Sequence, residues 1–569
     1  MKKYIIFAPI IAAGFALGSC SDFLDIEPQD EIVLENFWNE KSDVDNMIAG
    51  CYSMMQTEDF VTRLMIWGEV RSENIVSGNN VTSNTSLSNI FSENITQNNT
   101  YADWSDFYAV INACNLVIKY APQVAESDPD YTESTLRANI AEVSAIRDLC
   151  YFYLIRTFRD VPFTTEAYVD DNQELAIPAT EFDAVLDSLI EDLESIQDDA
   201  VEYYTETEPL YQTGRITQDA IHAMLCEMYL WKEDYEMCIW YADTVIGSKL
   251  KDYNERYSEY GGVVQGTVDE TINGFPLISD ANSTNTIYGS AFNDIFVDGN
   301  SDETIFELVF MDDDNLLSNA AVSYCYGNTD SDPGYFRPAD FIATNIEDEL
   351  YTIYINGYDT RSYENIRRYG DTDFRINKYA TDGATLTVST YTDPDDFTTS
   401  YGDTWRADYC HANWIIYRLT DVMLMKAEAL TQLASDDEKD SYISQAFQIV
   451  DAVNTRSNCD RQGVNVLDST EYTTKILMNN LVYEERHREL MFEGKRWYDL
   501  VRRSRREGDT DYLVEAVTEK YTTNMTAIQS KLSKMDAIYW PYTEDEMDVN
   551  PYLVQNSAYQ SNESSELAY

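Results

Sequence analysis

Apolar side chains recur at intervals of three and four residues through much of the first 250 positions, which is the period of an amphipathic helix. This pattern predicts helices over residues 103–120, 140–158 and 182–196. Pro162 ends the second of them, because proline cannot continue a helix.

Two stretches predict pairs of helices joined by short polar turns. Residues 213–247 contain two apolar stripes on either side of a turn at 232–234, and residues 418–433 and 442–456 form a second such pair. Closely joined helices of this kind are typical of tetratricopeptide (TPR) repeats, which must stack to bury their apolar faces. We therefore expect a mainly α fold built on a right-handed scaffold of TPR-like helical pairs.

The middle of the chain lacks helical periodicity. Residues 250–410 are rich in Asn, Asp, Gly, Ser, Thr and Tyr, and residues 75–100 share this character. They predict large irregular loop regions and a few short strands laid over the helical scaffold, where binding residues are usually found. We expect two regions in the mature chain: a helical N-terminal region at 36–250 and a C-terminal region at 251–569. The second divides into a loop-rich part at 251–410, a helical part at 411–505 and a closing segment at 506–569.

The first residues have the layout of a secretory signal. Lys2 and Lys3 precede an apolar run at 4–17, which is shorter than the ~20 residues of a membrane-spanning helix. The small residues that follow lead to Cys20, in a pattern that resembles a bacterial lipobox. We expect residues 1–19 to be removed, Cys20 to be acylated, and residues 20–35 to act as a tether. The alternative is an ordinary cleaved signal with a cysteine that is there by chance.

The composition of the chain excludes some classes of binding partner. The chain has 39 basic and 101 acidic residues and a net charge of −62, so it repels nucleic acid and anionic lipid. Its 43 Tyr and 9 Trp suit the stacking of sugar rings, but they suit helix packing equally well. No CxxC motif, Cys/His metal spacing or catalytic triad is evident. Four cysteines in apolar helical settings are expected to be buried core residues rather than disulfides: Cys114, Cys150, Cys226 and Cys238.

Several motifs together resemble the SusD/RagB family. EERHRELMFEGKRWYDLVR at 484–502 looks like its C-terminal signature, YRLTDVMLMKAEA at 417–429 like a second signature helix, and WPY at 540–542 like its closing segment. Residues 147–162 and 214–231 are similar to its N-terminal helices. With the lipobox, the resemblance extends over nearly the whole mature chain.

The resemblance implies a lipid-anchored protein of the outer membrane, displayed on the cell surface. Such proteins cover a SusC-like TonB-dependent porin, capture oligosaccharides and pass them to the channel. It implies neither a cofactor nor an enzymatic activity. Two alternatives stay open: the same scaffold binding peptide or another non-glycan nutrient, and, third, a glycoside hydrolase.

The residues of the signature have a physical explanation of their own. Glu485, Glu489 and Glu493 recur every four residues, with Arg488 and Arg496 three residues beyond the first and the last of them. We expect one packed helix whose ion pairs lock two parts of the fold, with the nearby glycine allowing close approach. The hydrolase alternative would make Glu489 and Glu493 an acid/base pair.

A ligand site is expected in the loops around 75–100, 280–340 and 390–408. A sugar platform needs exposed aromatic rings beside short polar side chains. If their segment is extended, residues 324 and 326 point the same way. The candidates are Tyr288, Tyr324, Tyr326, Tyr335, Phe336 and Trp405. No metal is expected, since the acidic turn at 312–315 lacks the spacing of a calcium loop.

Overall fold

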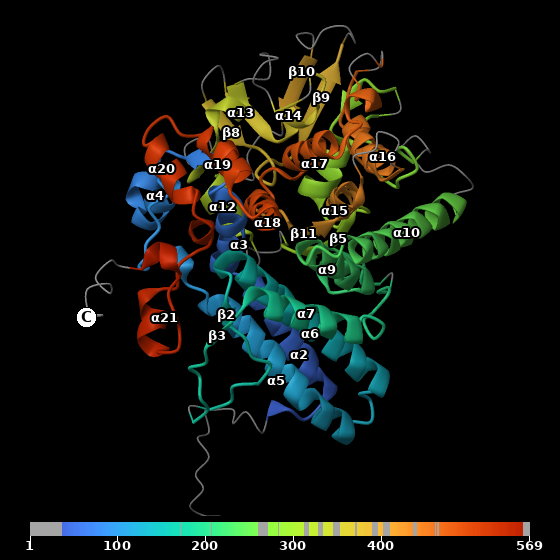
Figure 1. Cartoon of the computed structure of the whole chain (residues 1–569). Coiled ribbons are helices and arrows are strands. Elements are labelled where there is room, and N and C mark those ends of the chain that lie inside the picture. Colours follow the sequence, from blue (N-terminus) through green and yellow to red (C-terminus); the bar gives the residue numbers. More distant parts are fainter. Residues whose placement is uncertain are drawn as a thin grey trace, which may run out of the picture.

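The chain folds around a stack of helices that runs from α2 (Lys41–Met55) to α17 (Lys475–Leu490) in the computed structural model (Figure 1). The structure describes residues 37–170, 172–205, 207–259, 271–282, 284–311, 318–327, 334–344, 353–354, 356–369, 373–389, 397–401, 410–435, 441–460, 463 and 466–560. Successive helices of the stack pack on one another; between its two ends it contains α5 (Ser105–Ser127), α6 (Glu133–Phe158), α7 (Phe182–Ile196), α9 (Gln218–Trp231), α10 (Tyr235–Glu259), α15 (Leu419–Leu433) and α16 (Ser441–Arg456).

The predicted helices and both helical pairs are confirmed, and α9 and α10 show how local chemistry sets their ends. Thr217 caps α9 by accepting a hydrogen bond from the amide of Ala220. Glu233 has a positive φ of 63°, which allows the tight reversal after α9, and the Asp234 carboxylate accepts a bond from the first turn of α10. Cys226 and Cys238 then face each other with their sulfurs 3.7 Å apart as buried free thiols.

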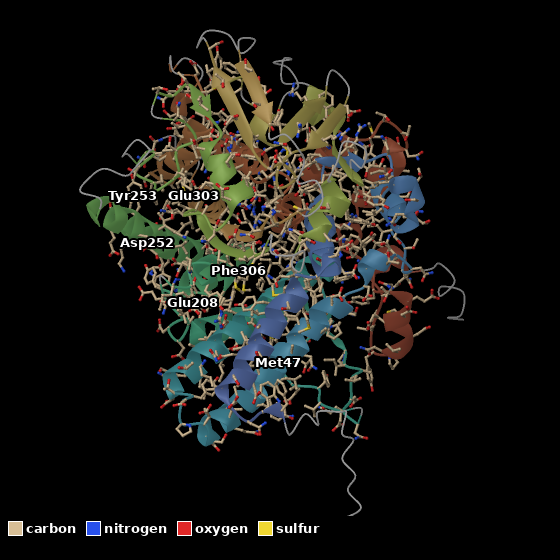
Figure 2. All side chains as sticks on the ribbon, turned by 180° about the vertical axis from the view of Figure 1, so that it is seen from behind. Met47, Glu208, Asp252, Tyr253, Glu303 and Phe306 are labelled. Carbon is tan, nitrogen blue, oxygen red and sulfur yellow. The ribbon has the colours of Figure 1, made fainter. Side chains whose placement is uncertain are left out.

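Short strands connect the stack to the loop-rich region. The strand β11 (Trp414–Arg418) pairs antiparallel with β5 (Thr304–Leu308), and every residue of both is buried. Figure 2 marks Phe306 of β5 and the neighbouring Glu303 in the view from behind. The other pairings are small: β1 (Ile75–Ser77) with β6 (Phe336–Pro338), β2 (Val161–Pro162) with β3 (Ala179–Thr180), β7 (Ile366–Tyr369) with β8 (Asp373–Ile376), and β9 (Ala384–Val388) with β4 (Ile287–Tyr288) and β10 (Phe397–Tyr401).

The closing segment returns across the N-terminal helices. The Trp540 amide donates to the carbonyl of Thr157 at the end of α6, at 2.9 Å, and the buried indole packs into the main core. The Glu544 amide, at the start of α21 (Glu544–Val549), donates to the carbonyl of Gln97 at 3.1 Å. The closing segment therefore fixes the end of α6 and the loop that contains Gln97. None of the described helices combines the length and the apolar character needed to cross a bilayer.

The prediction of one continuous helix over the signature is wrong. The helix α17 ends at Leu490, and α18 (Arg496–Glu507) begins after a break in which Phe492 and Gly494 have φ values of 67° and 72°. The buried carboxylate of Glu69 stabilises the break, since it accepts hydrogen bonds from the amides of Phe492 at 3.0 Å and Lys495 at 3.2 Å. The signature residues thus form a helix, a sharp turn and a second helix.

The ion pairs of the signature are confirmed in part. Arg488 pairs with Glu485 at 2.9 Å, as expected, but Arg496 turns away from Glu493 and pairs with Glu73 at 2.6 Å. The break reorients Arg496, so the three-residue spacing no longer brings it to Glu493. Glu489 and Glu493 are instead held by cations from other segments: Arg361, Arg418, Arg456 and Lys378.

Candidate functional site

Two of the predicted loop segments lie against each other in the structure. The first follows β1 and contains α4 (Thr85–Phe91), and the second contains α12 (Ala320–Tyr326) and β6. Pairing of β1 with β6 joins them, and the amide of Gly78 donates to the carbonyl of Tyr335 at 2.7 Å. Residues 75–100, 320–327 and 334–338 therefore form one surface.

Three half-buried tyrosines meet at this surface. The hydroxyls of Tyr101 and Tyr324 are 3.0 Å apart, and the Asn84 amide nitrogen donates to each of them at 2.9 Å. The ring of Tyr335 lies over that of Tyr324, with centroids 4.5 Å apart and planes inclined by 38°. We call Asn84, Tyr101, Tyr324 and Tyr335 the tyrosine cluster.

The cluster is held rigidly by the elements that carry it. Besides donating to the two hydroxyls, Asn84 caps α4 by accepting the amide of Leu87 at 3.0 Å. Tyr101 lies in a 3-10 turn (Thr100–Ala102), where its amide donates to the side-chain oxygen of Asn99 at 3.0 Å. Because these bonds fix the rings before any ligand arrives, binding would cost little side-chain entropy.

The chemistry of the cluster is that of neutral hydroxyls and aromatic faces. Burial raises the pKa of Tyr101, and the hydrogen bond that its hydroxyl donates to the Tyr324 hydroxyl adds to this effect. Burial also raises the pKa of Tyr324. Both phenols therefore stay protonated at neutral pH. They can donate and accept hydrogen bonds, but they offer no activated nucleophile.

The structure brings together two of the predicted site residues and buries three others. Tyr324 and Tyr335 belong to the cluster. The expected exposure of Tyr288, Tyr326 and Phe336 is wrong, since their exposed fractions are 4%, 0% and 1%. Tyr326 donates its hydroxyl to the carbonyl of Phe492 at 2.8 Å, so it anchors its loop to the core. Trp405 lies outside the described residues.

A wrong assumption about local structure explains one of these errors. Tyr324 and Tyr326 would share a face in an extended segment, but both lie in α12, where residues two apart point in different directions. The sequence reasoning also missed Asn84 and Tyr101. The helix-capping position of Asn84 before Leu87 was a local signal that could have drawn attention to it.

The carboxylates of the alternative acid/base pair do not fit catalysis. Burial alone would raise the pKa of Glu489, but Arg456, Arg418 and Arg361 outweigh it and hold the pKa well below its usual range. Arg418 and Lys378 likewise lower the pKa of Glu493 against the effect of burial. A general acid needs a raised pKa and access to substrate, and neither carboxylate has them. Within the described part of the chain, no group of three or more His, Cys, Asp or Glu side chains is arranged to hold a metal ion.

Two family models match the chain. The model described as the SusD family matches residues 298–559, and the model described as starch-binding associating with outer membrane matches residues 22–230. The SusD-like protein P38 of Formosa agariphila is 25% identical over 575 aligned positions, which cover 98% of this chain and 100% of the relative.

Solved structures share the fold. A SusD superfamily protein from Bacteroides thetaiotaomicron is 20% identical and superposes with a TM-score of 0.59, covering 92% of this chain and 99% of its own. Surface glycan-binding protein A from the same organism, solved in complex with laminarihexaose, is 18% identical with a TM-score of 0.60 and coverages of 91% and 100%. The two family models together match most of the chain, and the chain belongs to the SusD family.

Proposed function

We propose that this protein binds a neutral oligosaccharide at the tyrosine cluster. The observation that carries the proposal is the pre-arranged set of two inclined rings and two linked hydroxyls on Tyr101, Tyr324 and Tyr335. Aromatic faces stack on the apolar faces of sugar rings, while hydroxyls and amides bind sugar hydroxyls. The relative solved with laminarihexaose supports this class of ligand. The net charge of −62 disfavours anionic polysaccharides.

The bound glycan is passed to a SusC-like TonB-dependent transporter in the outer membrane. Support comes from membership of the SusD family and from the lipobox at Cys20, which would hold the chain at the membrane on the cell surface. No bond of the ligand is broken, since the phenols of the cluster are neutral and Glu489 and Glu493, the pair that a hydrolase would use, are held in ion pairs.

A glycan array on residues 21–569 tests the proposal. The expected result is retention of one class of neutral oligosaccharide, with laminarihexaose included as a probe, and recovery of the ligand at its original length. Shortened products would point to a hydrolase instead. Retention of peptides without any glycan would support the non-glycan alternative.

A further inference from the structure

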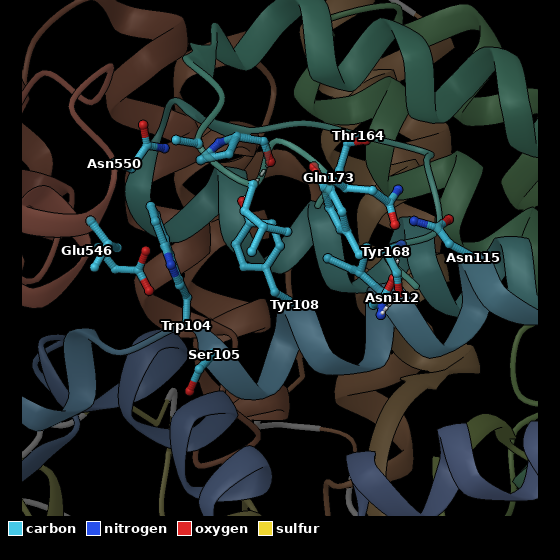
Figure 3. Close-up of a pocket in the computed structure, with 15 residues that line it drawn as sticks. Trp104, Ser105, Tyr108, Asn112, Asn115, Thr164, Tyr168, Gln173, Glu546 and Asn550 are labelled. Atoms are coloured by element: carbon cyan, nitrogen blue, oxygen red, sulfur yellow. Dashed lines mark hydrogen bonds between the residues drawn. The ribbon is translucent and has the colours of Figure 1, made fainter. Parts of the chain in front are cut away.

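A pocket lies in the lower part of the molecule as drawn in Figure 1, apart from the tyrosine cluster. It has a volume of about 570 Å³ and lies between α5, α21 and residues 162–178, which run from the last residue of β2 to the start of β3 (Figure 3). We call residues 162–178 the strap. The pocket is as large as a small-molecule site, and the proposed function does not use it.

Most polar groups that line this pocket are already bonded to the protein backbone. Asn112 accepts the amide of Tyr168 at 2.8 Å and donates to its carbonyl at 3.1 Å. Asn550 donates to the carbonyl of Ile177 at 2.8 Å. Three more side chains bond to the strap in the same way: Tyr108, Asn115 and Gln173. A sugar would find few free partners here, so the pocket suits an apolar group.

One wall and part of the rim of the pocket are apolar. Trp104, Tyr108 and Ile111 of the α5 region form one wall. At the rim, Leu175 is 62% exposed and Val549 is 72% exposed, and Tyr552 and Val554 extend the exposed apolar surface along the chain. Aliphatic side chains exposed around an apolar pocket are typical of protein interaction sites.

The two chain segments beside the pocket carry only acidic charges. Residues 162–180 contain four acidic residues, residues 541–560 contain four, and neither segment contains Lys or Arg. Glu546 lines the pocket and is half-buried, and among the described residues no Lys or Arg forms an ion pair with its carboxylate. Nucleic acid, anionic lipid and a second copy of this chain would all be repelled.

We propose that this pocket is a docking site for a protein segment that inserts an apolar side chain and places a Lys or Arg beside Glu546. The apolar lining takes up the inserted side chain, and the acidic surroundings select its basic neighbour. The inference does not rest on glycan binding, because it uses different residues.

Fluorescence anisotropy with short labelled peptides tests the inference on residues 21–569, which include every described residue. The probe alternates Leu and Lys, and the two control peptides alternate Leu with Glu and Gly with Lys. We expect the Leu/Lys peptide to bind, binding to weaken with added salt, and neither control peptide to bind. Equal binding of either control peptide would overturn the proposal, because it requires both features.

Substitutions at the pocket test whether the Leu/Lys peptide binds there. Glu546→Gln, and separately the double change Leu175→Ser with Val549→Ser, should each weaken the Leu/Lys peptide by about fivefold or more. Matched changes at exposed positions elsewhere, Glu484→Gln and Ile476→Ser, should leave its affinity unchanged. If both site variants bind the peptide as the parent does, the pocket is not the docking site. Glycan affinity should be the same in all of these variants.

Discussion

The guanidinium of Arg418 donates two hydrogen bonds to the carboxylate of Glu493, from Nε at 2.9 Å and from Nη2 at 2.7 Å, and both side chains are buried. Arg418 ends β11, whereas Glu493 lies in the break between α17 and α18. Lys378 contacts the same carboxylate from a third segment at 2.8 Å. This carboxylate therefore joins the loop-rich region to the helical stack.

Replacing Glu493 with Gln should lower the free energy of unfolding by ~3–5 kcal/mol, because Arg418 and Lys378 would keep buried charges without their counterion. Urea unfolding measures the loss. The control Glu484→Gln, at a side chain 56% exposed, should change stability by less than about 0.5 kcal/mol. The folded fraction of Glu493→Gln should bind ligand normally. Abolished binding with unchanged melting would reverse the structural assignment.

Gly68 and Gly494 lie in backbone contact, so a side chain at position 68 should destabilise the protein. A side chain at Gly50, where there is open space, should have the opposite effect. A Cβ at position 68 would come within 1.8 Å of the Gly494 carbonyl oxygen, so Gly68→Ala should destabilise the protein by about 1–3 kcal/mol or more. A Cβ added at Gly50, inside α2, would meet no atom within 4 Å outside its own helix backbone, so Gly50→Ala should stabilise the protein by about 0.5–1 kcal/mol. Thermal melting checks both signs. A melting temperature that is the same for Gly68→Ala as for the parent would contradict the close approach.

Low pH should destabilise the protein, because it protonates buried carboxylates that form ion pairs. Burial alone would raise the pKa of Glu428, but Arg502 and Arg506 lower it to about 2; Lys495 and Arg486 do the same for Asp421. A carboxyl with a lowered folded-state pKa stabilises the fold above its unfolded value and loses that contribution as pH falls toward the folded value. Stability should therefore drop between pH 4.5 and about 2.

Urea unfolding at a series of pH values measures this drop. Burial raises the pKa of Glu69 and Glu307 to about 7, so these two groups oppose the trend between pH 4.5 and 7. The stability that these two carboxyls contribute is fully present below pH 4.5 and is lost as the pH rises through about 7. The free energies of unfolding are therefore compared below pH 4.5. A value that does not change with pH in this range would argue against the ion-pair network.

Periodicity predicted the scaffold well, because each helix buries its own apolar stripe. The expected helix at 182–196 coincides with α7. The break in the signature could not be predicted in this way, because it depends on Glu69, which lies 423 positions before Phe492. A local pattern contains no information about a partner so distant in sequence.

The candidate site was predicted at the level of segments rather than residues. Loops rich in short polar residues were expected to carry it, and β1 and β6 bring two such loops together. Composition does not distinguish a tyrosine that anchors a loop, such as Tyr326, from a half-buried one, such as Tyr324. That difference arises from the helical turn of α12 and from the packing of Tyr326 on Phe492.

The proposed anchor at the membrane depends on one side chain, Cys20. Cys20→Ala removes the atom that would be acylated, and the protein should move from the membrane fraction to the soluble fraction. Cell fractionation followed by immunoblotting measures this. Protease treatment of whole cells should digest the parent protein if it is displayed on the surface. Continued membrane association of the variant would contradict the lipid anchor.

The most direct test of the central claim is calorimetry on the tyrosine cluster with the glycan that the array identifies. Tyr324→Ala and Tyr335→Ala should each weaken binding by ~1–3 kcal/mol, the range known for stacking of bases on aromatic side chains, and Tyr324→Phe should lose less because it keeps the ring. Tyr203→Ala, at a tyrosine 42% exposed elsewhere, serves as the control and should bind as the parent does. Parent-like affinity in both Tyr324→Ala and Tyr335→Ala, with normal melting, would show that the glycan binds elsewhere.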